Sequence, residues 1–201
     1  LDVLKNYEDF DRLERTVYGL ENVKEEKRLN AKRIYELSQL NPEGKIPDVM
    51  PMQPSFRHLC NILQINAFDI AKARKYYEAD IKNERDERRF NERAERAVFW
   101  IQNHAPEDFK FIINKEKRSD IELSDNERAF ISALKKELSQ NWDNYQTDKE
   151  LQNKIGNMVS EFELTTDIYK KLYQILINRD LGPKLAGFIR SIGKDKILNL
   201  L

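Results

Sequence analysis

The feature that most constrains the fold is a pair of helix-start signals in the C-terminal half, each followed by apolar residues at helical spacing. Ser124 and Thr147 each stand three positions before a glutamate, Glu127 and Glu150. This is the capping-box arrangement, in which the two side chains satisfy free N–H groups at the start of a helix. Two consecutive helices that each bury one face are therefore predicted. The apolar residues behind the boxes are Phe130, Ile131, Leu134 and Leu138, then Leu151, Ile155, Met158 and Phe162.

Helical spacing recurs along most of the chain, so the sequence predicts an all-α fold, a multi-helix bundle. Only six glycines and six prolines occur among the 201 residues, which is few for the many turns that a many-stranded fold needs. In a helix predicted at 22–40 we expect Leu29, Ile34 and Leu37 to face inward. At most one short β segment is predicted, near residues 109–114. The other helices are predicted at residues 2–18, 55–64, 66–80, 83–104, 167–181, 183–192 and 194–201.

Two stretches that disfavour helix divide the chain. Four prolines fall within residues 41–54 and predict an extended connector, because proline removes a backbone donor and restricts the residue before it. Residues 115–120 form a polar link. We therefore predict one helical subdomain at 1–118 and a second, C-terminal helical subdomain at 119–201.

Charge is balanced overall but unevenly distributed. The 35 basic and 35 acidic residues give a net charge of zero, which argues against a protein that coats nucleic acid non-specifically. Residues 120–163 carry 10 acidic and 5 basic side chains, whereas residues 165–201 carry 7 basic and 3 acidic ones. A neutral chain with a basic segment suits a local anionic partner. The alternative is that the two segments pair with each other.

No pattern of a known catalytic or metal site is present. There is neither a G-x-G-x-x-G nor a P-loop sequence, and a single cysteine, Cys60, with two histidines, His58 and His104, cannot build a Cys/His zinc site. His58 and Cys60 stand two positions apart on a predicted helix, where their side chains point away from each other. We therefore expect no catalytic residue and no metal. One cysteine fits a reducing compartment, and no apolar run approaches the roughly 20 residues of a membrane span.

The candidate binding residues cluster at the end of the chain. Lys184, Arg190 and Lys194 lie at or just after predicted helix breaks, and helix starts offer free N–H groups that suit phosphates. Phe188 lies among them and either stacks on an unpaired base or belongs to the core, the second being favoured.

A second set of candidates lies on the most charged helix. Arg85, Arg89, Arg93 and Arg96 share one face, and such a stripe is able to follow a phosphate backbone. Glutamates interleave with these arginines, so a solvated helix with internal ion pairs is the favoured alternative. Arg89 and Arg93 are nevertheless kept as candidates.

Four long segments carry a resemblance to a known family. They read YEDFDRLER (7–15), PSFRHLCNILQ (54–64), ERAERAVFWIQNHAPEDFKF (92–111) and IYKKLYQILINRDLGPKLAGFIRSIG (168–193). Together they resemble the C-terminal part of class I lysyl-tRNA synthetases. The resemblance implies an α-helix cage, related to the anticodon-binding part of bacterial-type glutamyl-tRNA synthetases, and a first helix that completes a stem-contact subdomain. The family's HIGH-like and KMSKS-like motifs have no counterpart here.

The resemblance therefore implies a non-catalytic fragment that recognises the anticodon end of lysine tRNA. A first residue other than Met agrees with a fragment. The whole enzyme would be cytoplasmic and would attach lysine to tRNA using ATP and Mg²⁺. The fragment itself is expected to bind no cofactor, neither ATP nor Mg²⁺. Its partners would be tRNA and the catalytic domain of the same chain, with no membrane. The alternative function is an all-helical protein-interaction module.

Overall fold

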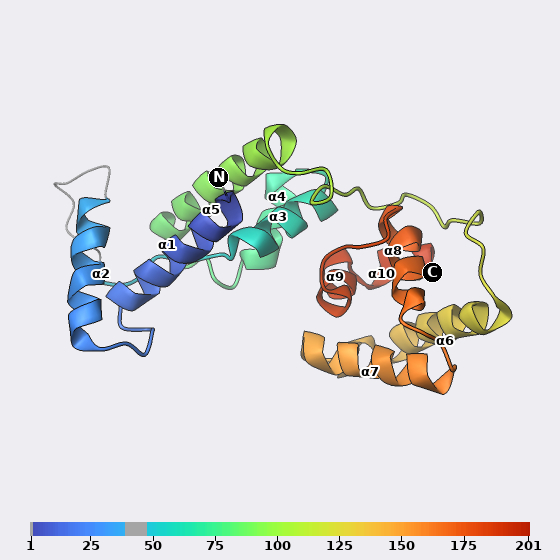
Figure 1. Cartoon of the computed structure of the whole chain (residues 1–201). Coiled ribbons are helices and arrows are strands. Elements are labelled where there is room, and N and C mark those ends of the chain that lie inside the picture. Colours follow the sequence, from blue (N-terminus) through green and yellow to red (C-terminus); the bar gives the residue numbers. More distant parts are fainter. Residues whose placement is uncertain (1, 39–47) are drawn as a thin grey trace. The chain divides into compact units, whose positions relative to one another are not determined.

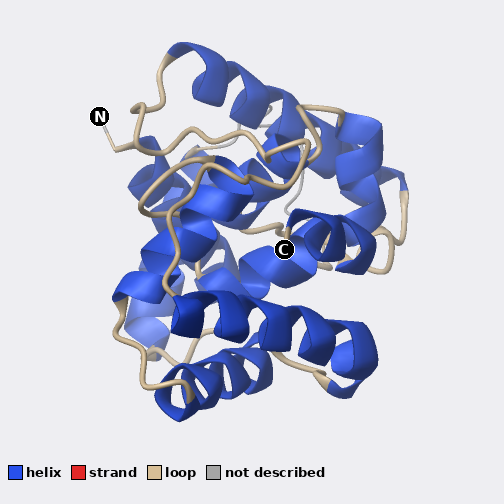
Figure 2. Cartoon of the chain, turned by 90° about the vertical axis from the view of Figure 1, so that its right-hand side faces the viewer, coloured by secondary structure: helices blue, strands red, loops and turns tan. Residues whose placement is uncertain are grey.

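The computed structural model describes residues 2–38 and 48–201. These residues divide into two compact units, Leu1–His104 and Ala105–Leu201. Within the described ranges every regular element is helical, with ten α-helices, two 3₁₀ helices and no strand (Figures 1 and 2). The predicted all-α class is thereby confirmed. None of the described helices combines the length and the apolar character that crossing a bilayer requires.

The segment near 109–114 is extended, without forming a strand in the described structure. It lies in the second unit, where Phe111 and Ile113 are buried and the Asn114 N–H donates to the Leu176 carbonyl at 2.8 Å. The first unit ends at His104 and the second begins at Ala105, so the division of the chain falls earlier than the subdomain boundary predicted after residue 118. The polar link at 115–120 thus follows a segment that already packs on the C-terminal helices.

The first unit packs its helices around the apolar helix α3. Phe56, Leu59, Ile62 and Leu63 of α3 are each at most 2% exposed, and Phe90 of α5 is fully buried. The Tyr7 ring stacks on Phe56 with 3.7 Å between ring centroids, which joins α1 to α3. The elements of this unit are α1 (Val3–Val17), α2 (Glu25–Leu37), α3 (Phe56–Ile65), α4 (Ile70–Arg74), η1 (Lys75–Tyr77) and α5 (Glu84–Asn103).

Helix α2 turns the opposite way from the prediction. Leu29, Ile34 and Leu37 are 61%, 56% and 76% exposed, whereas Ala31 and Tyr35 are buried. The expected inward orientation is therefore wrong for these three residues. The reason is a tertiary contact that the local pattern does not contain, described below for Tyr35. The predicted end of this helix near residue 40, and the first part of the proline-rich connector, lie outside the described residues.

The second unit is built on the two predicted capping boxes. Ser124–Glu127 starts α6 and Thr147–Glu150 starts α7, each with both reciprocal hydrogen bonds. The predicted stripes of α6 and α7 are buried, and Phe162, the C-cap residue of α7, packs edge-on against Phe130. The elements are α6 (Asp125–Asn141), η2 (Trp142–Asn144), α7 (Asp148–Glu161), α8 (Asp167–Ile177), α9 (Leu185–Ile192) and α10 (Lys194–Leu200).

Candidate nucleic-acid interface

The closing helices present their basic residues at turns of fixed shape. Helix α8 ends at Ile177, earlier than predicted, because Asn178 takes the left-handed conformation with φ 55°. The following loop packs on Tyr173, whose hydroxyl donates to the Pro183 carbonyl. A Cβ on Gly182 would lie 2.8 Å from the Tyr173 ring, so only glycine fits this approach. The loop therefore holds the start of α9 in place.

Lys184 and Lys194 occupy the starts of the last two helices. Lys184 is the N-cap residue of α9, and it is exposed. Lys194 is the first residue of α10 and follows Gly193, whose φ of +93° allows the sharp turn. Neither lysine forms an ion pair with a described residue. Lys184 is thus accessible to an anionic ligand, whereas Lys194 is half-buried, and their role as binding residues stays a prediction.

Arg190 lies near the end of α9 and is already engaged. Its Nη1 is 2.8 Å from Oδ1 of Asp148, at the start of α7, with side chains 37% and 63% exposed. The two helices are close here, since a Cβ on Gly187 would meet the same carboxylate at 2.6 Å. Such a half-exposed pair is worth about 0–1 kcal/mol, so Arg190 can exchange Asp148 for another anion at little cost.

Phe188 belongs to the core. It is 2% exposed and packs edge-on against Phe111, with 5.2 Å between centroids and 84° between planes. A ring held in this way has no free face on which a base could stack. Of the two roles that the sequence allows, the core role is the one that this geometry supports.

Arg93 lies inside the first unit rather than on a phosphate-binding face. It is 4% exposed, its two Nη atoms bind the Asp11 carboxylate, and Nη1 also donates to the Pro54 carbonyl at 2.9 Å. Its guanidinium lies over the Tyr7 ring, 5.5 Å from the centroid. Every contact described for this side chain is internal, so it fixes α1 and the connector onto α5.

Arg89 has the same kind of role. Its Nη atoms lie 2.9 and 3.2 Å from the carboxylate of Glu14, which is fully buried, and the Tyr35 hydroxyl donates to that carboxylate at 2.7 Å. This carboxylate and the burial together raise the pKa of Tyr35, with burial the larger cause. The cluster explains why α2 turns Tyr35 inward.

Two arginines of the stripe on α5, Arg89 and Arg93, are therefore paired, but with another helix. The sequence indicated ion pairs with neighbouring glutamates on α5, whereas Arg89 and Arg93 bind carboxylates of α1. In the described structure Glu84 and Arg88 form no ion pair. Spacing within one helix does not reveal a partner 75 or 82 positions away.

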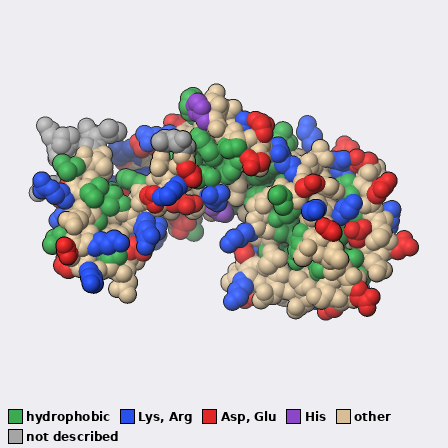
Figure 3. Space-filling model, viewed as in Figure 1, with side chains coloured by type: hydrophobic (Ala, Val, Ile, Leu, Met, Phe, Trp, Pro, Cys, Tyr) green, Lys and Arg blue, Asp and Glu red, His purple; other side chains and the backbone are tan. Residues whose placement is uncertain are grey.

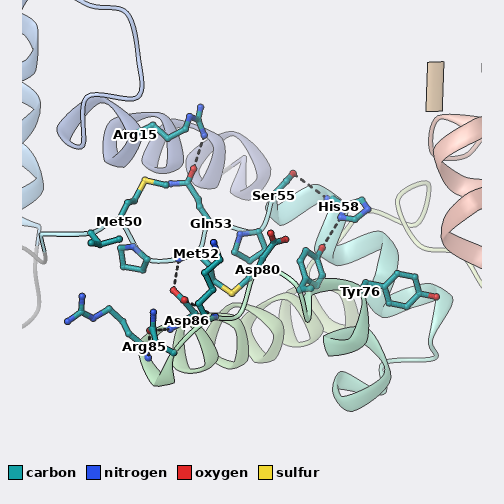
Figure 4. Close-up of a pocket in the computed structure, with 16 residues that line it drawn as sticks. Arg15, Met50, Met52, Gln53, Ser55, His58, Tyr76, Asp80, Arg85 and Asp86 are labelled. Carbon is teal, nitrogen blue, oxygen red and sulfur yellow. Dashed lines mark hydrogen bonds between the residues drawn. The ribbon is translucent and has the colours of Figure 1, made fainter. Parts of the chain in front are cut away.

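A cavity in the first unit gathers cations that sequence reasoning did not group. It encloses about 720 Å³ between α1, residues 49–55, Tyr76–Tyr77 and the start of α5 (Figure 4). Arg15, Lys82 and Arg85 line it. Arg15 is held by Glu21 at 2.8 Å and by Gln53 at 2.8 Å, whereas Lys82 and Arg85 form no ion pair with a described residue.

The walls of this cavity are fixed by hydrogen bonds. Asp86 accepts from the Met52 N–H at 2.8 Å and from the Lys82 N–H at 3.1 Å, which fastens the proline-rich segment to α5. On the other side, His58 Nδ1 lies 2.8 Å from the Tyr77 hydroxyl. Cationic side chains on a rigid wall suit a phosphate. The signal available in the sequence was Lys82 three positions before Arg85 at a helix start, and only Arg85 belongs to the predicted arginine stripe.

The histidine and cysteine of α3 form no reactive pair. Cys60 is fully buried, and burial raises the pKa of its thiol to about 12. His58 bonds Tyr77 instead. Among the residues that the structure describes, no group of three His, Cys, Asp or Glu side chains could hold a metal ion. Fold and site together define an all-α region whose recognisable chemistry is cationic, located at helix starts and around one cavity.

Comparison with known proteins identifies the family to which this all-α region is similar. No protein-family model matches the chain. The chain is 41% identical over 200 residues to the lysine–tRNA ligase of Borrelia garinii subsp. bavariensis, with 98% of this chain and 37% of that protein covered. The lysine–tRNA ligase of Treponema pallidum is 36% identical over 204 residues, covering 100% of the chain and 37% of the relative. That of the archaeon Thermococcus kodakarensis is 30% identical over 209 residues, covering 100% and 38%.

The resemblance seen in the sequence is confirmed, and the chain belongs to the lysine–tRNA ligase family as a C-terminal region of the class I type. It spans a little over a third of the length of the curated relatives it matches.

Proposed function

We propose that this chain is the tRNA-binding region of a lysine–tRNA ligase, and that it binds the anticodon stem-loop of lysine tRNA without taking part in the chemistry. The observation that carries the proposal is the match of almost the whole chain to one region of ligases whose names specify tRNA. Two lysines at helix starts support it, Lys184 exposed and Lys194 half-buried, because phosphates bind at such positions.

Lys184, Lys194 and Arg190 are the proposed phosphate contacts in the second unit. RNA loops are recognised through phosphate contacts together with splayed bases. Lys82 and Arg85 of the cavity supply a further pair of cations that suits the backbone of an RNA stem. Phe188, Arg89 and Arg93 support binding only by holding the helices in position.

The longer protein is proposed to attach lysine to its tRNA with ATP and Mg²⁺, in the cytoplasm. Its catalytic domain is the expected partner within the same polypeptide. We expect the present chain to bind neither ATP nor lysine, and to show no lysine-dependent exchange of pyrophosphate into ATP.

Titration of the chain with lysine tRNA and with an unrelated tRNA, at low and moderate salt, tests the proposal. Replacing Lys184 and Lys194 together by alanine should weaken binding of every tRNA and lower the salt slope by about one unit or less per lysine. The matched control is Lys136→Ala, an exposed lysine on α6. It should leave both quantities unchanged.

Asp148→Asn gives a second, opposite test. If Arg190 contacts phosphate, removal of its carboxylate partner should strengthen binding, and Arg190→Ala should cancel the gain. An equal affinity for lysine tRNA and the unrelated tRNA at every salt concentration would rule out specific recognition. Absence of measurable binding to either tRNA would instead favour the alternative, an all-helical protein-interaction module.

A further inference from the structure

A glycine within helix α9 leaves a space that an anionic group already fills. Gly187 lies in the segment Leu185–Ile192. The three atoms nearest to a Cβ built on it are Oδ2, Cγ and Oδ1 of Asp148, at 2.6, 3.3 and 3.9 Å. They make up the whole carboxyl group of that side chain, which therefore rests directly against the backbone of α9. We call this space, between Gly187 and Arg190, the α9 notch.

Basic side chains stand on both sides of the α9 notch. Lys184 precedes Gly187 by three positions and Arg190 follows it by three, and residues three apart are neighbours on one side of a helix. Arg190 Nη1 donates to Asp148 Oδ1 at 2.8 Å, whereas Lys184 is exposed. Figure 3 shows basic side chains on the surface over α9 and the start of α7. An anion in the notch thus contacts one cation directly and lies near a second.

Helix stability does not account for a glycine at this position. Glycine inside a helix is less favourable than alanine, because it loses more backbone entropy on folding. The Arg190–Asp148 pair, for which the glycine leaves space, has half-exposed side chains, and such pairs add little stability. Asp148 itself is explained by α7, because an acidic residue is favourable in a first turn. The missing side chain at 187 instead suits the close approach of a ligand to the backbone.

We propose that the α9 notch is an oxyanion site for a phosphate group of RNA, and that the Asp148 carboxylate closes it while no RNA is bound. This inference rests on the proposed function for the source of the phosphate. A phosphate oxygen takes the place of Oδ1 beside Arg190, whose planar guanidinium suits phosphate as well as carboxylate. Asp148, whose side chain is already 63% exposed, then turns into solvent. The internal carboxylate competes with every anion, so a phosphate displaces it only when further contacts hold the RNA.

Gly187→Ala tests the proposal, because the added methyl group occupies the α9 notch. The variant should fold without a lower Tm, since the group nearest to the new Cβ is the end of a flexible, exposed side chain. Its affinity for lysine tRNA should fall roughly tenfold, the usual effect of losing a hydrogen bond to a charged group, and the salt slope should fall by about one unit or less. Gly156→Ala in α7 is the matched control. Nothing lies within 4 Å of its added Cβ, so its affinity should not change.

A second measurement uses inorganic phosphate and no RNA. Phosphate is titrated at constant ionic strength into the isotope-labelled chain, and NMR follows the amide resonance at position 187. Binding should be weak in the parent chain and up to about fivefold tighter in Asp148→Asn, which lacks the competing charge. The double variant with Asp148→Asn and Gly187→Ala should show no such gain, because its notch is filled.

Three results would overturn the proposal. The first is equal affinity of Gly187→Ala and the parent chain for lysine tRNA. The second is an Asp148→Asn chain that binds phosphate no more tightly than the parent chain. The third is a gain from Asp148→Asn that persists with Gly187→Ala, because Arg190 would then bind phosphate outside the notch. A chain that binds phosphate in the notch but binds no tRNA would contradict the proposed function and leave the oxyanion site standing.

Discussion

Arg93 and Asp11 show how a side chain can look like a ligand contact in the sequence and serve the core in the structure. An arginine stripe on a charged helix is compatible with RNA binding or with self-pairing. The deciding partner comes from α1, far away in the sequence. The sequence indicated only that an arginine, if buried, needs a carboxylate partner, and it did not indicate which carboxylate.

Breaking this pair should be costly. Arg93→Met leaves the Asp11 carboxylate buried without its partner, so the free energy of unfolding should fall by about 3–5 kcal/mol. Urea unfolding followed by circular dichroism measures it. The exposed pair Arg57–Glu8 is the control, and Arg57→Met should cost less than about 1 kcal/mol. Similar losses for both variants would contradict the buried role.

Phe188 separates packing from base stacking. Phe188→Ala should lower the free energy of unfolding by about 3–5 kcal/mol, because it leaves a cavity beside Phe111. At temperatures where the variant stays folded, its affinity for tRNA should equal that of the parent chain. A stable variant that has lost about 1–3 kcal/mol of tRNA binding would instead indicate stacking.

Cys60 is expected to be inert until the first unit opens. Burial raises the pKa of its thiol from 9.0 to about 12, so the folded state favours the protonated form. This contribution to stability is fully present below pH 9 and is lost as the pH rises toward 12. A thiol reagent at pH 8 should therefore label the native chain very slowly and the urea-unfolded chain at once. Rapid labelling of the native chain would contradict the burial of α3.

At the scale of the element, helix starts were easier to predict than helix orientation. The capping boxes of α6 and α7 are local, so four adjacent residues contain the whole signal. The inward face of α2 is not local. Its two apolar faces compete, and a hydrogen bond between Tyr35 and Glu14 decides the outcome. The end of α8 was also predicted too late. Asn178 ends the helix by adopting a left-handed conformation, and most asparagines do not adopt it, so the residue type alone does not mark the end.

Two glycines of the second unit should respond oppositely to the same substitution. Gly193 has φ +93° between α9 and α10, so Gly193→Ala should destabilise the chain by about 1–3 kcal/mol. Gly156 lies within α7 with nothing within 4 Å of an added Cβ, so Gly156→Ala should stabilise it by about 0.5–1 kcal/mol. Thermal unfolding of the two variants checks the sign of each change.

At the scale of the whole molecule, the fold class was predictable and the cavity was not. Helical periodicity is repeated in nearly every segment, so errors at single boundaries do not alter the all-α class. The cavity is lined by residues between Arg15 and Asp86, which no short pattern relates. The placement of Lys184 at a helix start was recoverable, since the Gly-Pro break stands beside it.

The two compact units should unfold as separate cooperative transitions. Each has its own core, and each contains one tryptophan, Trp100 in the first and Trp142 in the second. Trp100→Phe and Trp142→Phe leave one fluorescent reporter per unit. Urea midpoints from the two variants should differ. Coincident midpoints and slopes, equal to those from circular dichroism, would show a single cooperative unit instead.

The ion pairs between α1 and α5 also set an order of events on the ribosome. Asp11 emerges 82 residues before Arg93, and Glu14 emerges 75 residues before Arg89. At the usual pace of translation this delay lasts roughly 4–16 s. During that time the nascent first helix holds two carboxylates that cannot yet be buried. The first unit therefore completes its folding only after α5, its last helix, has been synthesised. Until then α1 stays in contact with water or chaperones.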